Sequence, residues 1–139
     1  MKQHQETLEI HTRGRGFVEF TDRLRAVVRA AGVQTGLVVV YCRHTSCSLL
    51  IQENADPSAR RDMEHWLEKM APENDPDYTH TAEGPDDMPS HLRSLVTKTS
   101  ETIPVSGGEA VMGRWQGIFL AEHRARPHTR TLVIHVTGD

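Results

Sequence analysis

The longest uninterrupted apolar stretch of the chain extends from Leu37 to Cys42. It is much shorter than the roughly 18 apolar residues that a membrane-spanning helix needs, so we expect no membrane span. Apolar side chains on both sides of an extended segment are typical of a strand that is covered on both faces. The stretch therefore predicts an interior strand over residues 35–42, against which other elements must pack.

Three segments carry apolar residues at helical spacing, and their stripes are expected to face the core. Asp56 and Pro57 supply the N-cap and the first residue of the second helix, and Pro89 opens the third. The predicted helices cover residues 20–31, residues 57–70 and a short segment after Pro89, with stripes at Leu24, Val27, Val28 and Ala31, at Met63, Trp66, Leu67 and Met70, and at Leu92, Leu95 and Val96.

The remaining regular segments are predicted to be strands, and Ser106-Gly107-Gly108 is typical of a hairpin turn between two of them. These strands cover residues 4–12, 35–42, 45–51, 99–105, 109–112, 115–123 and 129–136. The resulting order, β α β β α α β β β β, indicates one α+β domain over residues 1–139 with a mostly antiparallel sheet. Residues 72–88 are expected to form a long loop, a kind of segment that is often functional.

The composition argues against a nucleic-acid partner. Sixteen basic and 19 acidic residues give a net charge of −3, and aromatic residues make up 5% of the chain. A nucleic-acid binder usually carries a basic stripe and aromatic stacking platforms. Met1 to Arg13 contains no apolar stretch of the kind found in secretory signals, so we expect a cytoplasmic location.

The two cysteines, Cys42 and Cys47, are expected to be free thiols. On an extended chain their Cα atoms would lie about 17 Å apart, whereas a disulfide needs less than about 7 Å. Free thiols are typical of a reducing compartment. Both residues fall on apolar strand faces, which indicates inert thiols.

Nine histidines are the most unusual feature of the composition, and we expect at most three or four of them to share a site. His44 begins a segment in which alternation along a strand puts His44, Ser46 and Ser48 on one face. This face either lines a polar pocket, with His44 as a metal ligand or acid–base group, or lies at a solvated sheet edge. Histidine is the commonest metal ligand in proteins.

A second candidate constellation lies between His80 and His91, which flank Asp86 and Asp87. Two carboxylates between two histidines resemble a divalent-metal or acid–base site. The alternative is that one aspartate caps the helix opened by Pro89 and that His91 is a buried structural histidine. Glu53 and Asn54 immediately precede another helix N-terminus, a location that favours anions.

Three motifs together resemble the YjbQ-like family, whose members are also named secondary thiamine-phosphate synthases. They are HTSCSLLIQENADP, HTAEGPDDMPSHLRS and GRWQGIFLAEHRARPHTR, in the family's order and spacing. The resemblance implies a sheet curved into a half-barrel with helices packed on it, and a homotrimer with polar pockets near the subunit interfaces. It also implies a weak ability to join a pyrimidine diphosphate to a thiazole phosphate with release of pyrophosphate.

The resemblance also implies roles for the residues of this chain that occupy the family's characteristic polar positions. The expected catalytic residues are Asp87, Glu53 and Glu122; the residues expected to bind a phosphorylated small molecule are Thr45, Ser48, Asn54, Gln116 and Arg130; the expected metal ligands are His44, His80 and His91. Asp56 and Asp62 complete the set. The histidines favour zinc and the carboxylates favour Mg²⁺.

Two departures from the family pattern are visible. Arg114 stands where the family usually has Thr, so it either supplies a charge to a bound anion or blocks its site. Cys47 stands where Ala is typical. A metal-binding or ligand-binding trimer without chemistry of its own is the alternative to an enzyme.

Overall fold

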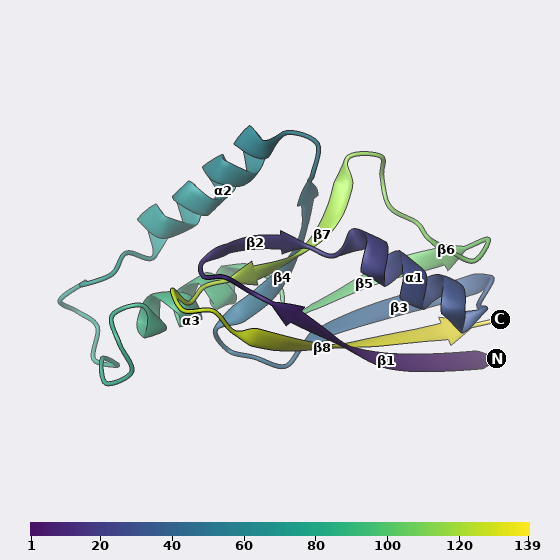
Figure 1. Ribbon diagram of the computed structural model, residues 1–139, viewed down its shortest axis with the longest axis horizontal. Coiled ribbons are helices and arrows are strands. Elements are labelled where there is room, and N and C mark those ends of the chain that lie inside the picture. Colours follow the sequence, from purple (N-terminus) through teal and green to yellow (C-terminus); the bar gives the residue numbers. More distant parts are fainter.

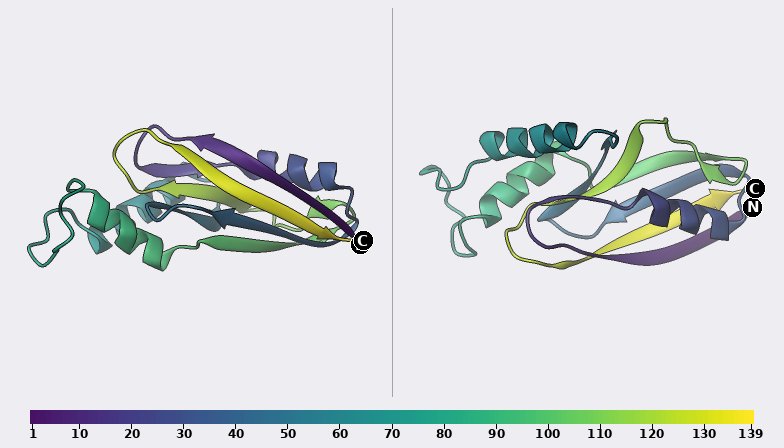
Figure 2. Two further views of the ribbon diagram at one scale, coloured as in Figure 1. Left: turned by 90° about the horizontal axis from the view of Figure 1, so that it is seen from below. Right: turned by 45° about the horizontal axis from the view of Figure 1, so that its top comes forward.

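A computed structural model describes residues 1–139 as two antiparallel sheets and three helices (Figure 1). The elements are β1 (Lys2–His11), β2 (Gly16–Glu19), α1 (Thr21–Ala31), β3 (Thr35–Cys42), β4 (Cys47–Glu53), α2 (Pro57–Met70), α3 (Asp87–Val96), β5 (Ser100–Ser106), β6 (Glu109–Ala110), β7 (Gln116–Glu122) and β8 (Thr129–Gly138). The larger sheet has the order β1-β8-β3-β5-β6 and curls into a half-barrel; the smaller one has the order β2-β7-β4 (Figure 2). The α+β fold is therefore confirmed, and every strand pairing is antiparallel.

The core lies between the inner faces of the two sheets and α1. β3 and β8 occupy the middle of the larger sheet, and alternate residues such as Val38, Val40 and Ile134 are fully buried there. From α1, Leu24 and Val28 pack into the same cluster. The apolar stretch that predicted an interior strand is β3, although Leu37 and Tyr41 on its other face are exposed.

Local signals placed both ends of α2 well, whereas α3 begins at Asp87, two residues before the predicted start at Pro89. Asp56 is the N-cap of α2, where its carboxylate accepts a hydrogen bond from the Ser58 backbone N–H at 2.9 Å. The sequence pattern did not predict β2, a strand of only four residues. β2 pairs with β7, about a hundred residues further along the chain, and strand pairing at that distance leaves no local signal.

The apolar stripes of α2 and α3 were predicted to face the core, but they do so only in part: Leu67 and Met63 of α2 pack in the smaller core cluster. Trp66 on α2 is 59% exposed and Leu95 on α3 is 77% exposed. The two helices lie at one end of the molecule (Figure 1), beyond most of the sheet surface. α3 instead turns Ser90 and Arg93 inward, where they donate hydrogen bonds to backbone carbonyls.

The two cysteines are free, as predicted, but the reasoning from an extended chain was wrong. Residues 43–46 leave β3 and turn into β4, so the chain does not stay extended between the thiols. The Sγ atoms of Cys42 and Cys47 lie 3.5 Å apart in the core. None of the three helices is long and apolar enough to cross a membrane.

Candidate functional site

His80, Asp87 and His91 converge where the 72–88 loop enters α3. The Nε2 atom of His80 lies 2.7 Å from Oδ2 of Asp87, and the Nε2 atom of His91 lies 3.1 Å from the same oxygen. One ligand atom from each residue lies within 4.8 Å of the other two. α3 brings Asp87 and His91 together because residues four apart share a helix face, and the loop returns His80 to them.

The tautomer of His91 follows from its second nitrogen. Nδ1 lies 2.9 Å from the backbone carbonyl oxygen of Thr45. A carbonyl only accepts, so Nδ1 carries the proton and a neutral ring leaves Nε2 as a bare lone pair. That lone pair faces the Asp87 carboxylate, which also only accepts. Two facing acceptors require a proton or a cation between them.

The other side of Asp87 is fixed by Arg124, which donates from Nη1 to Oδ1 at 2.8 Å. Arg124 also donates from Nε to Asp86 Oδ2, and the Ala125 N–H donates to the same oxygen. Burial raises the pKa of the Asp87 carboxyl, but the hydrogen bond with His80, the charge of Arg124 and the charge that His91 carries when its ring is protonated outweigh burial and hold the pKa below its usual value. Asp87 therefore presents a charged, oriented oxygen to the two imidazoles.

Neither aspartate acts as the side-chain cap that was the alternative interpretation. Asp86 occupies the N-cap position of α3, but its carboxylate makes no capping hydrogen bond. Asp87 is the first helical residue and is only 3% exposed at its side chain. His91 is partly exposed, so it is not the buried structural histidine of that interpretation either.

This donor set fits a divalent cation of the zinc class. Two imidazole nitrogens and one carboxylate oxygen are typical ligands of zinc sites that keep an open position. The His80 side chain is 48% exposed, so the cluster opens to solvent on one side. The hydrogen bond from His91 to Thr45 is the kind of second contact that orients a metal-binding imidazole.

A groove of about 720 Å³ adjoins the cluster and includes His91 in its wall. His44, Thr45 and Ser94 also line it, with Arg43 at its side. His44 does not join the other two histidines, because its Nε2 accepts a hydrogen bond from the Thr131 backbone N–H at 2.8 Å. Burial and the charge of Arg130 lower the pKa of His44. The structure thus replaces the three-histidine grouping by His80, Asp87 and His91, with His44 in the adjacent groove.

Ser48 lies inside the protein rather than on a pocket wall. Its hydroxyl is 2.8 Å from Nε2 of His123 and also contacts the hydroxyl of Thr97. His123 is itself buried, and burial lowers its pKa to about 3. The predicted alternation with His44 breaks because β4 begins only at Cys47.

Glu122 and Arg130 form a buried pair with each other. Arg130 donates from Nε and Nη2 to the two carboxylate oxygens of Glu122, and Thr12 donates a further hydrogen bond. The burial that raises the pKa of Glu122 is outweighed by these hydrogen bonds, and the pKa lies below its usual value. Every oxygen of Glu122 already has a protein partner.

Glu53, Asn54 and Gln116 lie at the opposite end of the smaller sheet. Glu53 is in register with Gln116, whereas Cys47 is in register with Glu122. Six residues of strand, at about 3.3 Å each, put roughly 20 Å between these two ends. Within one chain, the predicted site residues thus separate into two groups. Glu53 accepts hydrogen bonds from the Ala55 and Asp56 backbone, and the Gln116 side chain accepts one from Gly113.

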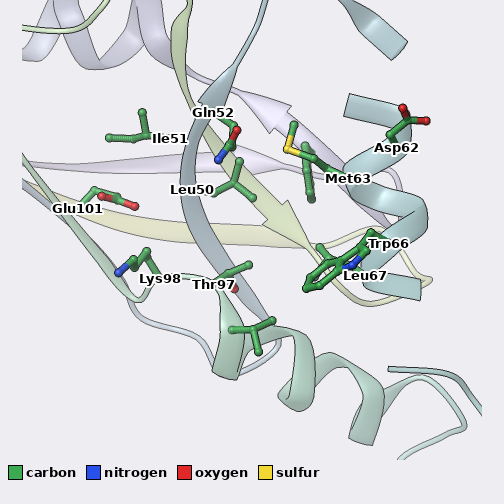
Figure 3. A pocket seen from close by; sticks show the side chains of 12 residues that line it. Leu50, Ile51, Gln52, Asp62, Met63, Trp66, Leu67, Thr97, Lys98 and Glu101 are labelled. Carbon is green, nitrogen blue, oxygen red and sulfur yellow. The ribbon is translucent and has the colours of Figure 1, made fainter. Parts of the chain in front are cut away.

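A separate cavity of about 450 Å³ lies between α2 and β4 (Figure 3). Leu50, Met63 and Leu67 give it an apolar wall, while Asp62 and Lys98 lie at opposite sides of it. None of the three clustered residues lines this cavity, so it is distinct from the histidine site.

Sequence reasoning missed the role of Arg124, which anchors both aspartates. Arg124 lies beyond the end of β7, in an irregular segment, so strand alternation gives no signal for it. The part played by the Thr45 carbonyl had no sequence signal, because every residue carries the same carbonyl group.

Comparison with known proteins supplies the relatives of this chain. The family described as "UPF0047 protein YjbQ-like" matches residues 6–139. The chain is 50% identical to the UPF0047 protein sll1880 of Synechocystis over 99% of its own length and 94% of that protein. It is 39% identical to the UPF0047 protein YjbQ of Escherichia coli O157:H7, over 98% of this chain and 99% of that protein.

Comparison with solved structures gives the same family fold. A conserved hypothetical protein from Thermus thermophilus superposes with a TM-score of 0.84 at 34% identity. The match covers 95% of this chain and 99% of that one. The half-barrel architecture is therefore shared with an experimentally solved relative.

Proposed function

Because the chain belongs to the YjbQ-like UPF0047 family, we propose that it is a metal-dependent protein acting on phosphorylated small molecules. In this proposal His80, Asp87 and His91 hold one divalent cation of the zinc class. The observation that carries it is the pair of imidazole nitrogens facing a single carboxylate oxygen of Asp87, one of them with its proton fixed on the far nitrogen.

The proposed reaction is the one that the family resemblance implies. The methylene carbon of a pyrimidine diphosphate forms a bond to the nitrogen of a thiazole phosphate, and the carbon–oxygen bond to pyrophosphate breaks. A bound cation would neutralise negative charge on the leaving pyrophosphate. Arg43 and the hydroxyls of Thr45 and Ser94 lie along the adjoining groove and offer donors to phosphate oxygens.

The protein's own residues hold this arrangement in place. Arg124 orients Asp87 by donating to its Oδ1, and Thr45 orients His91 through Nδ1. The exposed side of His80 leaves room for a substrate oxygen. We place the activity in the cytoplasm, a reducing compartment in which free cysteines are typical.

A homotrimer is part of the proposal. Trp66, Leu95 and Val96 are apolar and strongly exposed on α2 and α3, and such patches often mark protein–protein contacts. A second copy could also bring its Glu53 and Gln116 end towards the cluster, which would reunite the two groups of predicted site residues. Sedimentation equilibrium tests the assembly: three chains per particle are expected, and a monomer contradicts this part.

The cation site is tested by elemental analysis and zinc titration of untagged protein. We expect about one zinc per chain in the wild type, and a loss of binding of at least tenfold in His80→Ala and in His91→Ala. His65→Ala is the matched control, since His65 is exposed and makes only a 4.0 Å contact with Glu68. Equal zinc binding in all four proteins would overturn the site.

Turnover is tested separately by pyrophosphate release from the two substrates, with and without a chelator. Release that disappears in His91→Ala and with the chelator supports the enzyme. Stoichiometric zinc without any turnover supports the alternative, a metal-binding trimer with no chemistry of its own. The full hydrogen bonding of Glu122 favours this alternative, because that carboxylate has no oxygen left for acid–base work in this structure.

A further inference from the structure

Cys42 and Cys47 meet at the junction of the two sheets. Cys42 ends β3 in the larger sheet, and Cys47 begins β4 in the smaller one. Their Sγ atoms are 3.5 Å apart, and both residues are buried in the main core cluster. We propose that this pair is an oxidation site, at which peroxide converts two thiols into an intramolecular disulfide that links the two sheets.

The geometry requires only a small movement. A disulfide bond is about 2.05 Å long, so the sulfurs must approach each other by roughly 1.5 Å. The two sulfurs already contact each other directly, so no other side chain has to be displaced from between them. The chain between them is the irregular 43–46 segment, which belongs to no strand.

The two thiols are not equivalent, which gives the reaction a direction. The Cys42 thiol donates weakly to the backbone carbonyl of Cys47 at 3.4 Å in the resting state. A hydrogen bond from the Cys47 thiol lowers the pKa of Cys42 despite its burial, and the same contact together with burial raises the pKa of Cys47. The charge of Arg130 favours both thiolates, and the charge of its ion-pair partner Glu122 opposes them. Cys42 also lines the groove beside His44, whereas Cys47 does not, so peroxide from the groove meets Cys42 first. Cys42 is therefore the attacking thiol and Cys47 the resolving one.

The chemistry balances in two steps. The Cys42 thiolate attacks one oxygen of hydrogen peroxide, the O–O bond breaks, and the products are a sulfenic acid and, after protonation, water. The Cys47 sulfur then attacks the Cys42 sulfur, the S–O bond breaks, and a second water leaves. Peroxide is reduced, both sulfurs are oxidised, and the protein loses two hydrogen atoms.

The 43–46 segment connects this site to the histidine cluster. The Thr45 carbonyl accepts the hydrogen bond from His91, and the Ser46 carbonyl accepts one from the His123 backbone N–H. Drawing Cys42 and Cys47 together shortens the span of this segment. Oxidation therefore changes the environment of the His91 ring.

The first test treats the reduced, full-length protein with graded hydrogen peroxide, then unfolds it in an alkylating reagent. Intact mass spectrometry is expected to show the loss of two hydrogens and no alkylation, with a peptide that joins Cys42 to Cys47. Cys47→Ala should instead yield a Cys42 sulfenic acid that a dimedone probe captures. Two thiols that remain alkylatable in the wild type, or a disulfide between molecules, would overturn the proposal.

The second test follows the imidazole nitrogens of His91 by NMR in the metal-free protein. Peroxide is expected to shift these signals in the wild type and to leave them unchanged in Cys42→Ala, whose folding is checked by its amide spectrum. Because no metal is present, the result does not depend on the proposed cation site. An unchanged His91 signal in a disulfide-bonded wild type would refute the connection to the cluster.

Discussion

Glu122 and Arg130 join the two sheets through a buried, two-pronged ion pair. Glu122 ends β7 of the smaller sheet, Arg130 lies in β8 of the larger one, and Nε and Nη2 of the guanidinium each donate to a different carboxylate oxygen. Removing one member of a buried pair leaves the other charge without a partner in the core.

Glu122→Gln is therefore expected to lower the free energy of unfolding by about 3 kcal/mol or more. Urea denaturation followed by circular dichroism measures it. Glu109→Gln is the control, because Glu109 pairs with Arg29 at the surface and both side chains are solvated. An equal, small effect of the two substitutions would show that the buried pair contributes no more than the exposed one.

Arg93 provides the opposite case among buried arginines. Its Nη2 donates to the Ala71 carbonyl, but Nε and Nη1 have no partner, and burial lowers its pKa. Arg93→Met removes a poorly compensated charge and keeps much of the side-chain volume, so the stability should change by less than about 1 kcal/mol or increase. Arg130→Met is the matched comparison and should destabilise by about 3 kcal/mol. Similar losses in the two variants would contradict this difference.

His123 makes the protein sensitive to mild acid. Burial holds its folded-state pKa at about 3, against an ordinary value of 6.5. Between these values the unfolded chain binds a proton that the folded chain does not, so stability is complete above pH 6.5 and falls as the pH drops. The loss from this one group is at most about 1.4 kcal/mol per pH unit.

The measurement is the free energy of unfolding between pH 7 and about 5.5, a window above the ordinary pKa values of Asp and Glu. His123→Gln should have a shallower pH dependence than the wild type, whereas the exposed His65→Gln should keep the wild-type slope. Identical slopes in all three proteins would mean that His123 takes up its proton in the folded state as readily as in the unfolded one.

Gly36 and Gly138 face each other in the β3–β8 ladder. A Cβ atom built on Gly36 would overlap the backbone carbonyl oxygen of Thr137, and backbone cannot move aside without breaking the ladder. Gly36→Ala should therefore cost about 1–3 kcal/mol in thermal or urea unfolding. At Gly113 the nearest atom to a new Cβ is the end of the flexible Gln116 side chain, at 3.2 Å, so Gly113→Ala should cost clearly less.

Local features of the sequence were sufficient to predict those parts of the structure that depend on residues close together in the chain. The Asp56-Pro57 start of α2 and the strand over residues 35–42 rest on short-range stereochemistry and on the apolar run. The constellation between His80 and His91 was also visible, since Asp87 and His91 lie four residues apart on one helix.

What failed depends on contacts between distant segments. His44 was grouped with His80 and His91, but the β3–β4 turn directs it to the Thr131 backbone of β8. Ser48 was placed on a pocket wall by alternation, which does not extend through the bend before β4. The predicted distance between Cys42 and Cys47 was wrong for the same reason, because a distance calculated for an extended chain does not apply across a turn.

The place of β8 between β1 and β3 has a consequence for how the chain reaches this fold. β1 is made first and β8 last of the eleven elements, yet β8 is the strand on which β1 pairs along its whole length. During synthesis β1 stays unpaired with β8 while more than a hundred further residues are made. Such long-range pairing is slow, so the ladder between β1 and β8 closes late. Until it closes, the unpaired edge of β1 is exposed to aggregation.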